Sequence, residues 1–385
     1  IWPWLGSVMN AGSEAALTAL ASFVRAMACV PFSSVPTRML SGWEVAAYYA
    51  LLACVCAIGS DPFRRHRFRR ASRRIAKRPA AVMCGVGILC FLAFRPAPFE
   101  VVVIHVGQGD AIFVSAPGGV SILVDTGTAH AGNRHVVPYL RRRGVKRLDL
   151  LVITHEHADH AGGAGAVAGL LRTECIAVPS CADGRTWAGI LGEIAAARGG
   201  ESPRVVRLSQ GDVIRVGEVA LEVLNPPPAS TAAPDGRSID ANENSIVLRL
   251  VYRGFSMLLC ADAGAQFERR ILDEPPHRTW LTAQVVKIGH HGSSGASTFR
   301  FLEAVRADLA IVSVGRNGYG HPSPAAIGRI LDTGAELRQT DTCGAVSVSI
   351  APRLAAQAKR SEVSCAAHDM RSVWGRALMF RRLRM

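Results

Sequence analysis

The part of the sequence best suited to chemistry is a cluster of possible metal ligands at positions 154–160, which reads Thr-His-Glu-His-Ala-Asp-His. It follows an apolar run at 150–153 and precedes two glycines, so we expect a strand, a turn and then a helix. Histidines two positions apart in an extended turn can converge on one cation, while the aspartate and the next histidine turn toward a second. The pattern therefore predicts a metal site built on His155, His157, Asp159 and His160.

Three further segments carry side chains that could complete this site. Asp125 and Asp262 each follow a β-branched or apolar run, and a Gly-His-His-Gly-Ser sequence at 289–293 follows another. Each segment is weak evidence alone, because an aspartate after a strand is usually a turn or capping residue.

Together and in this order, the segments resemble the metallo-β-lactamase superfamily, whose central motif is Thr-His-x-His-x-Asp-His after a strand. More narrowly, Val-Gly-Gln-Gly-Asp at 106–110, His-His-Gly-Ser at 290–293 and Tyr-Gly-His-Pro-Ser at 319–323 resemble ComEC proteins of DNA internalisation and competence. The resemblance implies an α/β fold of the αββα-sandwich type, preceded by transmembrane helices. It also implies uptake of one DNA strand through a membrane channel and degradation of the other strand by the hydrolase domain.

The resemblance also implies a ligand set for two divalent ions, manganese or zinc. One ion would be held by His155, His157 and Asp262, and the other by Asp159, His160, Asp262 and His290. The superfamily commonly supplies another histidine to the first ion, but no histidine lies between His160 and His277.

The segment that matches the missing histidine contains Asn242, Asn244 and Ser245. Asparagine or aspartate oxygen from positions 240–245 could ligate the first ion, and oxygen-rich ligation would favour manganese or magnesium over zinc. Contact with substrate, or a simple turn, are the alternatives.

The expected reaction is metal-assisted hydrolysis of a phosphodiester. Asp159 would orient or deprotonate the attacking water, and the candidates for contacting phosphate or protonating the leaving oxygen are His291, Ser293 and His321. A packing role at a helix start fits His321 equally well. Asp110 and Asp125 could support a ligating histidine by hydrogen bonds, or could be ordinary turn residues.

Two apolar runs, at 43–59 and 80–94, flank a loop that carries nine lysines and arginines between positions 64 and 78. Both runs are shorter than the roughly 20 residues of a perpendicular membrane span, so buried helices of a soluble domain are the alternative. Aromatic residues at one end and Arg95 at the other favour membrane spans. Because short basic loops stay in the cytoplasm, we expect a multi-pass protein of the inner (plasma) membrane with its later part on the external or periplasmic face.

After position 99 the sequence changes to short β-branched runs separated by glycine, aspartate and proline, with helix-like stretches between some of them. We expect residues 1–98 to be the end of a membrane-embedded competence domain, 99–352 the hydrolase domain and 353–385 a basic, flexible tail. Since Ile1 opens the chain and no leader follows, we expect a truncated start.

The net charge of +14 suits DNA and membrane lipid as partners, and the resemblance adds other competence-machinery proteins. We therefore expect a metal-dependent nuclease in a DNA-uptake protein. One alternative is a metallohydrolase of small esters, lactones or thioesters, because fold does not determine substrate. The other is a DNA channel protein whose external domain binds DNA without catalysis.

Overall fold

The computed structural model describes residues 98–200, 204–228, 240–274 and 280–350, together with Thr18 and the backbone of 363–368 and 381–382. The spans expected at 43–59 and 80–94, and the basic loop between them, lie outside the described residues. Among the helices within the described ranges, none is long and apolar enough to cross a bilayer.

The first of two large sheets has nine strands in the order β18-β17-β16-β1-β2-β3-β5-β7-β8. Neighbours from β18 to β3 are antiparallel, and those from β3 to β8 are parallel. The strands are β1 (Phe99–Val103), β2 (Ile112–Ala116), β3 (Val120–Val124), β5 (Leu150–Val152), β7 (Cys175–Pro179), β8 (Arg204–Leu208), β16 (Ala345–Ile350), β17 (Val363–His368) and β18 (Arg381–Arg382).

The second sheet has seven strands in the order β15-β14-β13-β12-β11-β10-β9, antiparallel from β9 to β12 and parallel from β12 to β15. Its strands are β9 (Val213–Val216), β10 (Val219–Asn225), β11 (Val247–Tyr252), β12 (Phe255–Leu259), β13 (Val285–Lys287), β14 (Leu309–Val312) and β15 (Glu336–Gln339). A separate pair joins β4 (Arg147–Leu148) to β6 (Arg172–Thr173).

Side chains alternate across each strand, so each sheet has an inner and an outer face. The two inner faces pack against each other. Val101 and Val103 of β1 share a core with Leu221 and Leu250 of the second sheet. Val102, which lies between the two valines, belongs to a different core on the outer face of the first sheet.

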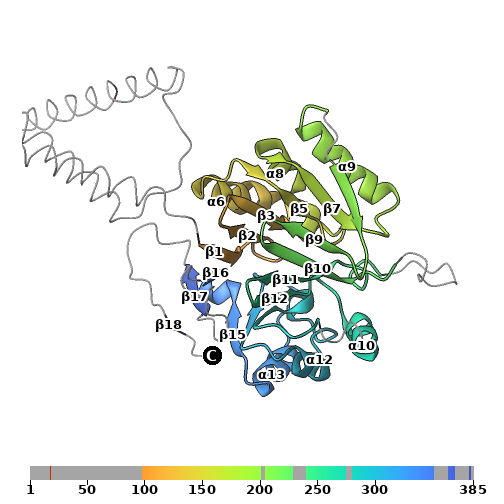
Figure 1. Cartoon of the computed structure of the whole chain (residues 1–385), viewed down its shortest axis with the longest axis vertical. Coiled ribbons are helices and arrows are strands. Elements are labelled where there is room, and N and C mark those ends of the chain that lie inside the picture. Colours follow the sequence, from red (N-terminus) through yellow and green to blue (C-terminus); the bar gives the residue numbers. More distant parts are fainter. Residues whose placement is uncertain are drawn as a thin grey trace, which may run out of the picture.

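Helices cover both outer faces, which gives four layers (Figure 1). Leu140, Val167 and Ile194 pack helices onto the first sheet, and Phe267 and Phe301 do so on the second. The longer helices are α6 (Val137–Arg142), α8 (Ala164–Leu170), α9 (Arg185–Ala197), α10 (Ala265–Asp273), α12 (Phe299–Val305) and α13 (Pro324–Asp332). The short ones are α5 (Ala129–Ala131), η3 (Gly132–Val136), α7 (Ala158–Ala161), η5 (Gly289–Gly292) and α14 (Thr340–Cys343).

This arrangement confirms the α/β sandwich expected from the sequence. Within the stretch expected to be a tail, β17 and β18 extend the first sheet. The basic, irregular composition of the tail conceals these strands, because they add to an edge that β16 already provides.

Candidate metal centre

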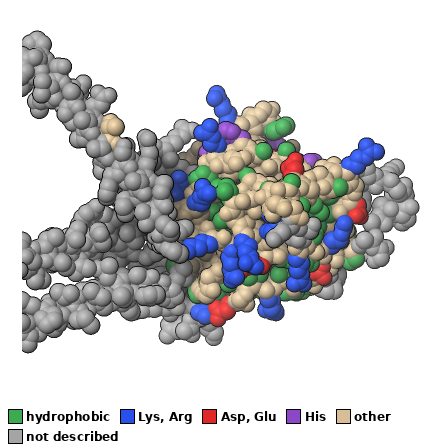
Figure 2. Space-filling view, turned by 90° about the horizontal axis from the view of Figure 1, so that it is seen from above, with side chains coloured by type: hydrophobic (Ala, Val, Ile, Leu, Met, Phe, Trp, Pro, Cys, Tyr) green, Lys and Arg blue, Asp and Glu red, His purple; other side chains and the backbone are tan. Residues whose placement is uncertain are grey.

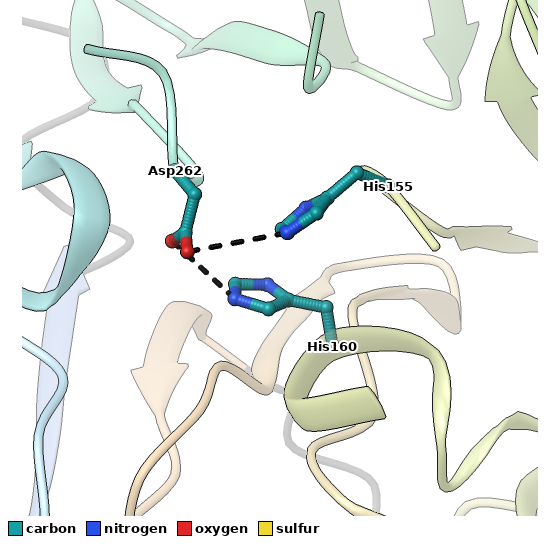
Figure 3. Close-up of side chains that lie close together, drawn as sticks. All are labelled: His155, His160 and Asp262. Carbon is teal, nitrogen blue, oxygen red and sulfur yellow. Dashed lines mark ion pairs between the residues drawn. The ribbon is translucent and has the colours of Figure 1, made fainter. Parts of the chain in front are cut away.

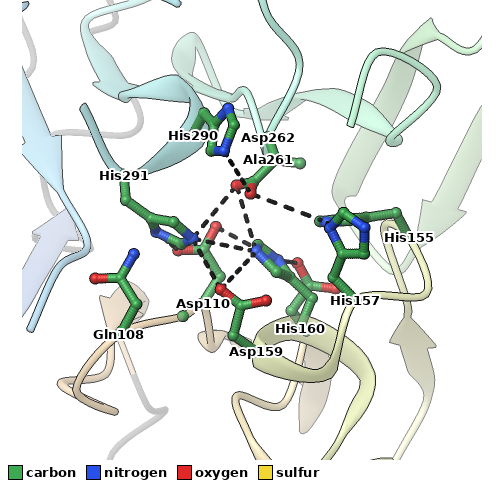
Figure 4. Close-up of polar contacts among 12 residues, drawn as sticks. Gln108, Asp110, His155, His157, Asp159, His160, Ala261, Asp262, His290 and His291 are labelled. Atoms are coloured by element: carbon green, nitrogen blue, oxygen red, sulfur yellow. Dashed lines mark hydrogen bonds and ion pairs between the residues drawn. The ribbon is translucent and has the colours of Figure 1, made fainter. Parts of the chain in front are cut away.

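The expected ligands come from loops at one edge of the sandwich, where strands of both sheets end (Figure 4). Asp125 follows β3, the central motif follows the parallel strand β5, and Asp262 follows β12, whose parallel neighbour β13 precedes the histidine pair. Carboxyl ends of parallel strands lie at the same edge of a sheet, which is where α/β proteins bind ligands. The fold therefore brings together side chains that are far apart in sequence.

Asp262 faces two neighbouring histidines of the central motif, His155 and His160 (Figure 3). Its Oδ1 is 3.3 Å from His160 Nε2, and its Oδ2 is 3.9 Å from His155 Nε2. All three side chains are buried. A carboxylate that presents one oxygen to each side has the arrangement needed to bridge two cations.

His291 completes a second group of possible ligands with Asp159 and His160. Its Nε2 is 3.4 Å from Asp159 Oδ2, 3.3 Å from His160 Nε2 and 3.5 Å from Asp262 Oδ1. Figure 4 shows its ring pointing into the cluster.

His290 lies farther out, although the family resemblance gives it the ligand role. Its Nε2 is 3.9 Å from Asp262 Oδ2, and its side chain is 32% exposed. Both His290 and His291 have left-handed backbone conformations, with φ of 47° and 52°. This tight turn directs His291 inward and leaves His290 at the rim, so the structure places the two residues in the reverse of the expected order.

Hydrogen bonds orient the buried histidines. His160 Nδ1 donates to Asp125 Oδ2 at 2.8 Å, and Asp125 also accepts from Thr154 N and Oγ1 at 2.8 and 2.7 Å. His291 Nδ1 donates to Ser313 O at 2.9 Å. We assign the remaining contact, of 3.0 Å, to His155 Nδ1 donating to Thr154 Oγ1. Each histidine thus turns its Nε2 lone pair toward the cluster, as metal-binding histidines do.

The donor set fits divalent cations. The Nε2 atoms of His160 and His291 face each other at 3.3 Å, and Asp262 Oδ1 is buried without a hydrogen-bond donor among the described residues. When the histidines are neutral, as metal ligands must be, these lone pairs and carboxylate oxygens repel one another unless positive charge lies between them. Imidazole and carboxylate ligands suit zinc and also manganese.

The pKa shifts of the buried histidines also indicate that the cluster is stabilised by positive charge. Burial lowers the pKa of His160, but the charges of Asp262 and Asp125 outweigh it, so this pKa is raised well above its usual value. For His291, burial likewise lowers the pKa, but the charge of Asp262 and a hydrogen bond to Asp159 raise it overall. Burial and the neighbouring His160 lower the pKa of His155 well below its usual range. Without metal, protons on His160 and His291 thus supply the positive charge. Bound cations would supply it in their place.

The end of the cluster near His155 is more open. His157 is exposed, and its Nδ1 is 3.2 Å from His155 Nε2. Beside them is a pocket of about 200 Å³, lined by His155, Glu156, Pro179, Cys181, Ala241 and Asn244. The segment that replaces the missing histidine therefore lies at this end.

The other two residues of that segment are positioned by the backbone. Ser245 N donates to Asn242 O at 3.0 Å, and Ile246 N donates to Thr154 O at 3.0 Å, which ties the segment to the central motif. Asn242 Oδ1 and Ser245 Oγ are buried without a hydrogen-bond partner in the described part of the chain. Both oxygens therefore have spare acceptor capacity.

Asp110 approaches the cluster from the loop between β1 and β2. Its Oδ1 is 3.7 Å from His291 Nδ1, and its backbone N donates to Asp159 O at 3.1 Å. Gly109 permits this approach, because a Cβ at its φ of 125° would lie 2.2 Å from the same carbonyl oxygen. The Gly-Gln-Gly-Asp sequence thus forms a loop that packs closely against the backbone of the central motif.

Lys287, which sequence reasoning missed, is buried beneath the site. Its Nζ forms an ion pair with Asp110 and donates to Ala261 O at 3.0 Å. Burial lowers its pKa, but the charges of Asp110 and Asp262 raise it overall, so the side chain is a cation. The only signal in the sequence is a lysine at the end of an otherwise apolar strand, directly before the histidine pair.

Ser293 and His321 lie on the rim. Ser293 Oγ accepts from Gly295 N at 3.3 Å, a contact within its own turn. The His321 ring is 5.5 Å from the His290 ring, and its Nδ1 is buried without a hydrogen-bond partner among the described residues. His321 is therefore near the cluster but not part of it.

Residues 105–231 match the sequence profile described as the metallo-beta-lactamase superfamily. The chain contains a metallo-β-lactamase domain. The profile spans the loop of Asp110, the strand end of Asp125 and the central motif, which are the features that build one side of the cluster.

The chain also has homologues among competence proteins of the ComEC family. It is 28% identical over 289 residues to ComE operon protein 3 of Bacillus subtilis, covering 69% of this chain and 35% of the relative. It is 32% identical over 284 residues to competence protein ComA of Neisseria gonorrhoeae, covering 72% and 36%. Recombination protein 2 of Haemophilus influenzae is 28% identical over 306 residues, covering 73% and 33%. The chain thus spans about a third of the length of these relatives.

Proposed function

We propose that the metallo-β-lactamase domain is a metal-dependent nuclease of a DNA-uptake protein and degrades the strand that is not imported. The observation that carries the proposal is the carboxylate of Asp262, whose Oδ2 faces His155 and whose Oδ1 faces His160 and His291. The similarity to competence proteins supports DNA as the substrate.

Two ions, manganese or zinc, fit this donor set. His155, His157 and Asp262, with oxygen from Asn242, Asn244 or Ser245, would hold the first ion. Asp159, His160, Asp262 and His291 would hold the second, with His291 taking the place that the resemblance gives to His290. When bound, such ions neutralise negative charge on phosphoryl oxygens and make water a better nucleophile.

Asp159 is the residue best placed to act on water. Burial raises the pKa of its carboxyl group, but a hydrogen bond from His291 and the charges of His160 and His291 lower it overall. Its side chain is 30% exposed, whereas Asp262 is buried. Asp159 is therefore an ionised group within reach of solvent, able to orient a water molecule or accept its proton.

The rim residues would contact the substrate. His290 is half-buried, and burial lowers its pKa more than the charge of Asp262 raises it. With His321 and Ser293, it forms a polar border on one side of the cluster. Neutral imidazoles there can donate a hydrogen bond to phosphate or to a leaving oxygen.

Lysines and arginines spread over the surface would attract DNA without forming one defined binding groove. Figure 2 shows lysine and arginine side chains spread over one face rather than gathered beside one groove. Arg143, Arg147 and Arg172 are also engaged in ion pairs with carboxylates. We therefore propose that the metal cluster and its rim supply most of the specificity for the scissile phosphate.

We also propose that the whole protein resides in the inner (plasma) membrane, with this domain on the external face, in contact with lipid and with other competence-machinery proteins. The support for this is the basic loop between two apolar runs, together with the competence-protein homologues.

The decisive experiment incubates the full chain with single- and double-stranded DNA in Mn²⁺, Zn²⁺ or EDTA. Asp159→Asn should abolish metal-dependent cleavage, while Asp332→Asn, at an exposed carboxylate on α13, should not. DNA binding without cleavage in either metal would favour a DNA channel protein with a non-catalytic external domain.

A second candidate is hydrolysis of a small ester, lactone or thioester. The pocket of about 200 Å³ beside His155 has a volume suited to a small acyl group. Turnover of such compounds, with DNA neither bound nor cleaved, would replace the nuclease proposal.

A further inference from the structure

The loop at 315–323 presents an aromatic side chain to solvent close to the metal cluster. Tyr319 is 77% exposed, more than any other large hydrophobic residue in the described ranges. Its ring lies 5.9 Å from that of His321, with 33° between the planes, and the His321 ring lies 5.5 Å from that of His290. The rings thus form a series that leads from solvent to the rim of the cluster.

The loop is held rigidly by the side chain of Asn317. Its Oδ1 accepts from the backbone N of Tyr319 and His321 at 3.0 and 3.1 Å. Its Nδ2 donates to Gly315 O and His321 O at 2.8 and 2.7 Å. Ser323 N donates to Gly292 O at 2.8 Å, which fastens the loop to the turn that carries the histidine pair. The backbone that carries the exposed ring is therefore fixed relative to the cluster.

An exposed aromatic ring on a rigid loop in this position is suited to stacking on another flat ring. Exposing it costs hydrophobic free energy that a bound partner would recover. A nucleobase is such a partner, because every base has a π-face that stacks on aromatic side chains. Arg316 is exposed in the same loop and offers positive charge to the adjacent phosphate.

We infer that Tyr319 is a stacking platform for an unpaired nucleobase next to the scissile phosphate, so that the domain takes single-stranded or frayed DNA. In a duplex, neighbouring bases already cover the base faces, and exposing one requires unstacking. The inference rests on the proposed nuclease function, because it takes the metal cluster to be the place where phosphate is bound.

The test measures binding of the full chain to a fluorescent single-stranded 12-mer in EDTA, where metal-dependent cleavage does not occur. Tyr319→Ala should weaken binding by about 5- to 150-fold, the effect of losing one base stack. Tyr319→Phe keeps the ring and should bind within about threefold of wild type. Phe299→Ala removes an exposed aromatic ring from α12 and should have no effect.

An abasic strand of the same length separates stacking from backbone contacts. It should bind wild type and Tyr319→Ala equally, because it has no base for the ring to contact. Equal binding of the normal strand by wild type and Tyr319→Ala would overturn the inference, as would an equal loss for the abasic strand. Loss of binding to anionic lipid vesicles with unchanged DNA binding would also overturn it, in favour of a lipid-contacting residue.

The inference and the nuclease proposal can fail separately. A base-dependent effect of Tyr319→Ala with no cleavage in Mn²⁺ or Zn²⁺ supports the platform and removes the nuclease. Cleavage with unchanged binding and KM in Tyr319→Ala removes the platform and retains the nuclease.

Discussion

Replacing Lys287 by methionine should destabilise the domain strongly, because the substitution leaves a buried carboxylate without its cation. Lys287 is 0% exposed and Asp110 is 1% exposed, and their side chains form an ion pair. Removing one partner of a buried pair costs about 3–5 kcal/mol. In a domain of this size, each kcal/mol lowers the Tm by about 2–4 °C, so we expect a decrease of about 6–20 °C.

The measurement is thermal unfolding of the full chain in EDTA, so that metal binding does not contribute to stability. Lys146→Met makes the same substitution at an exposed lysine and should change the free energy of unfolding by less than about 0.5 kcal/mol. Asp110→Asn, added to Lys287→Met, should recover most of the lost stability, because the amide carries no charge to compensate.

Two results would refute this reasoning. One is a Tm for Lys287→Met within about 2 °C of wild type, which would mean that the ion pair contributes little to stability. The other is an additive loss in the Lys287→Met/Asp110→Asn variant, since additivity means that two side chains are not coupled.

Three other predictions concern the metal cluster. His291→Ala should lower the number of ions bound per chain, whereas His290→Ala should leave it unchanged; metal analysis of the purified variants decides, and the opposite pattern would restore the ligand set of the family. Gly109→Ala should prevent metal binding, because its Cβ would lie 2.2 Å from a carbonyl oxygen of the central motif, while Gly107→Ala, with φ of 78° but nothing within 4 Å, should cost only about 1 kcal/mol. Binding of Mn²⁺ or Zn²⁺ should release protons and become tighter as pH rises, because His160 and His291 have raised pKa values without the ion and must be neutral to ligate it. Calorimetry in two buffers of different ionisation enthalpy counts the protons, and no release would contradict the assignment.

The features that local sequence determines were predicted well. Strands such as β1 and β2 have β-branched runs, and the ligands of the central motif are neighbours in the chain, so their types and spacing are visible together. The position of Asp262 beside the histidines of the central motif depends on how two sheets face each other. It could be expected only because the family resemblance supplied it.

The choice between His290 and His291 could not be made from local pattern. Adjacent residues in an extended segment point in opposite directions, but here both histidines have positive φ, a conformation that histidine adopts infrequently. The contact of His291 Nδ1 with Ser313 O, from a segment 22 residues later, fixes the outcome. Long-range packing, rather than the sequence Gly-His-His-Gly, therefore decides which ring enters the cluster.

The buried charges link the number of ions to the class of substrate. Asp110, Asp125, Asp159 and Asp262 lie in the cluster and Lys287 compensates one of them, so the five residues carry a net charge of −3. One divalent ion would leave this group with a net charge of −1, which suits an uncharged ester or lactone better than an anion. Two divalent ions would give it a net charge of +1, which suits an anionic phosphodiester because opposite charges attract more strongly where water is excluded. Two ions per chain would thus favour the nuclease, and one would favour the small-ester hydrolase.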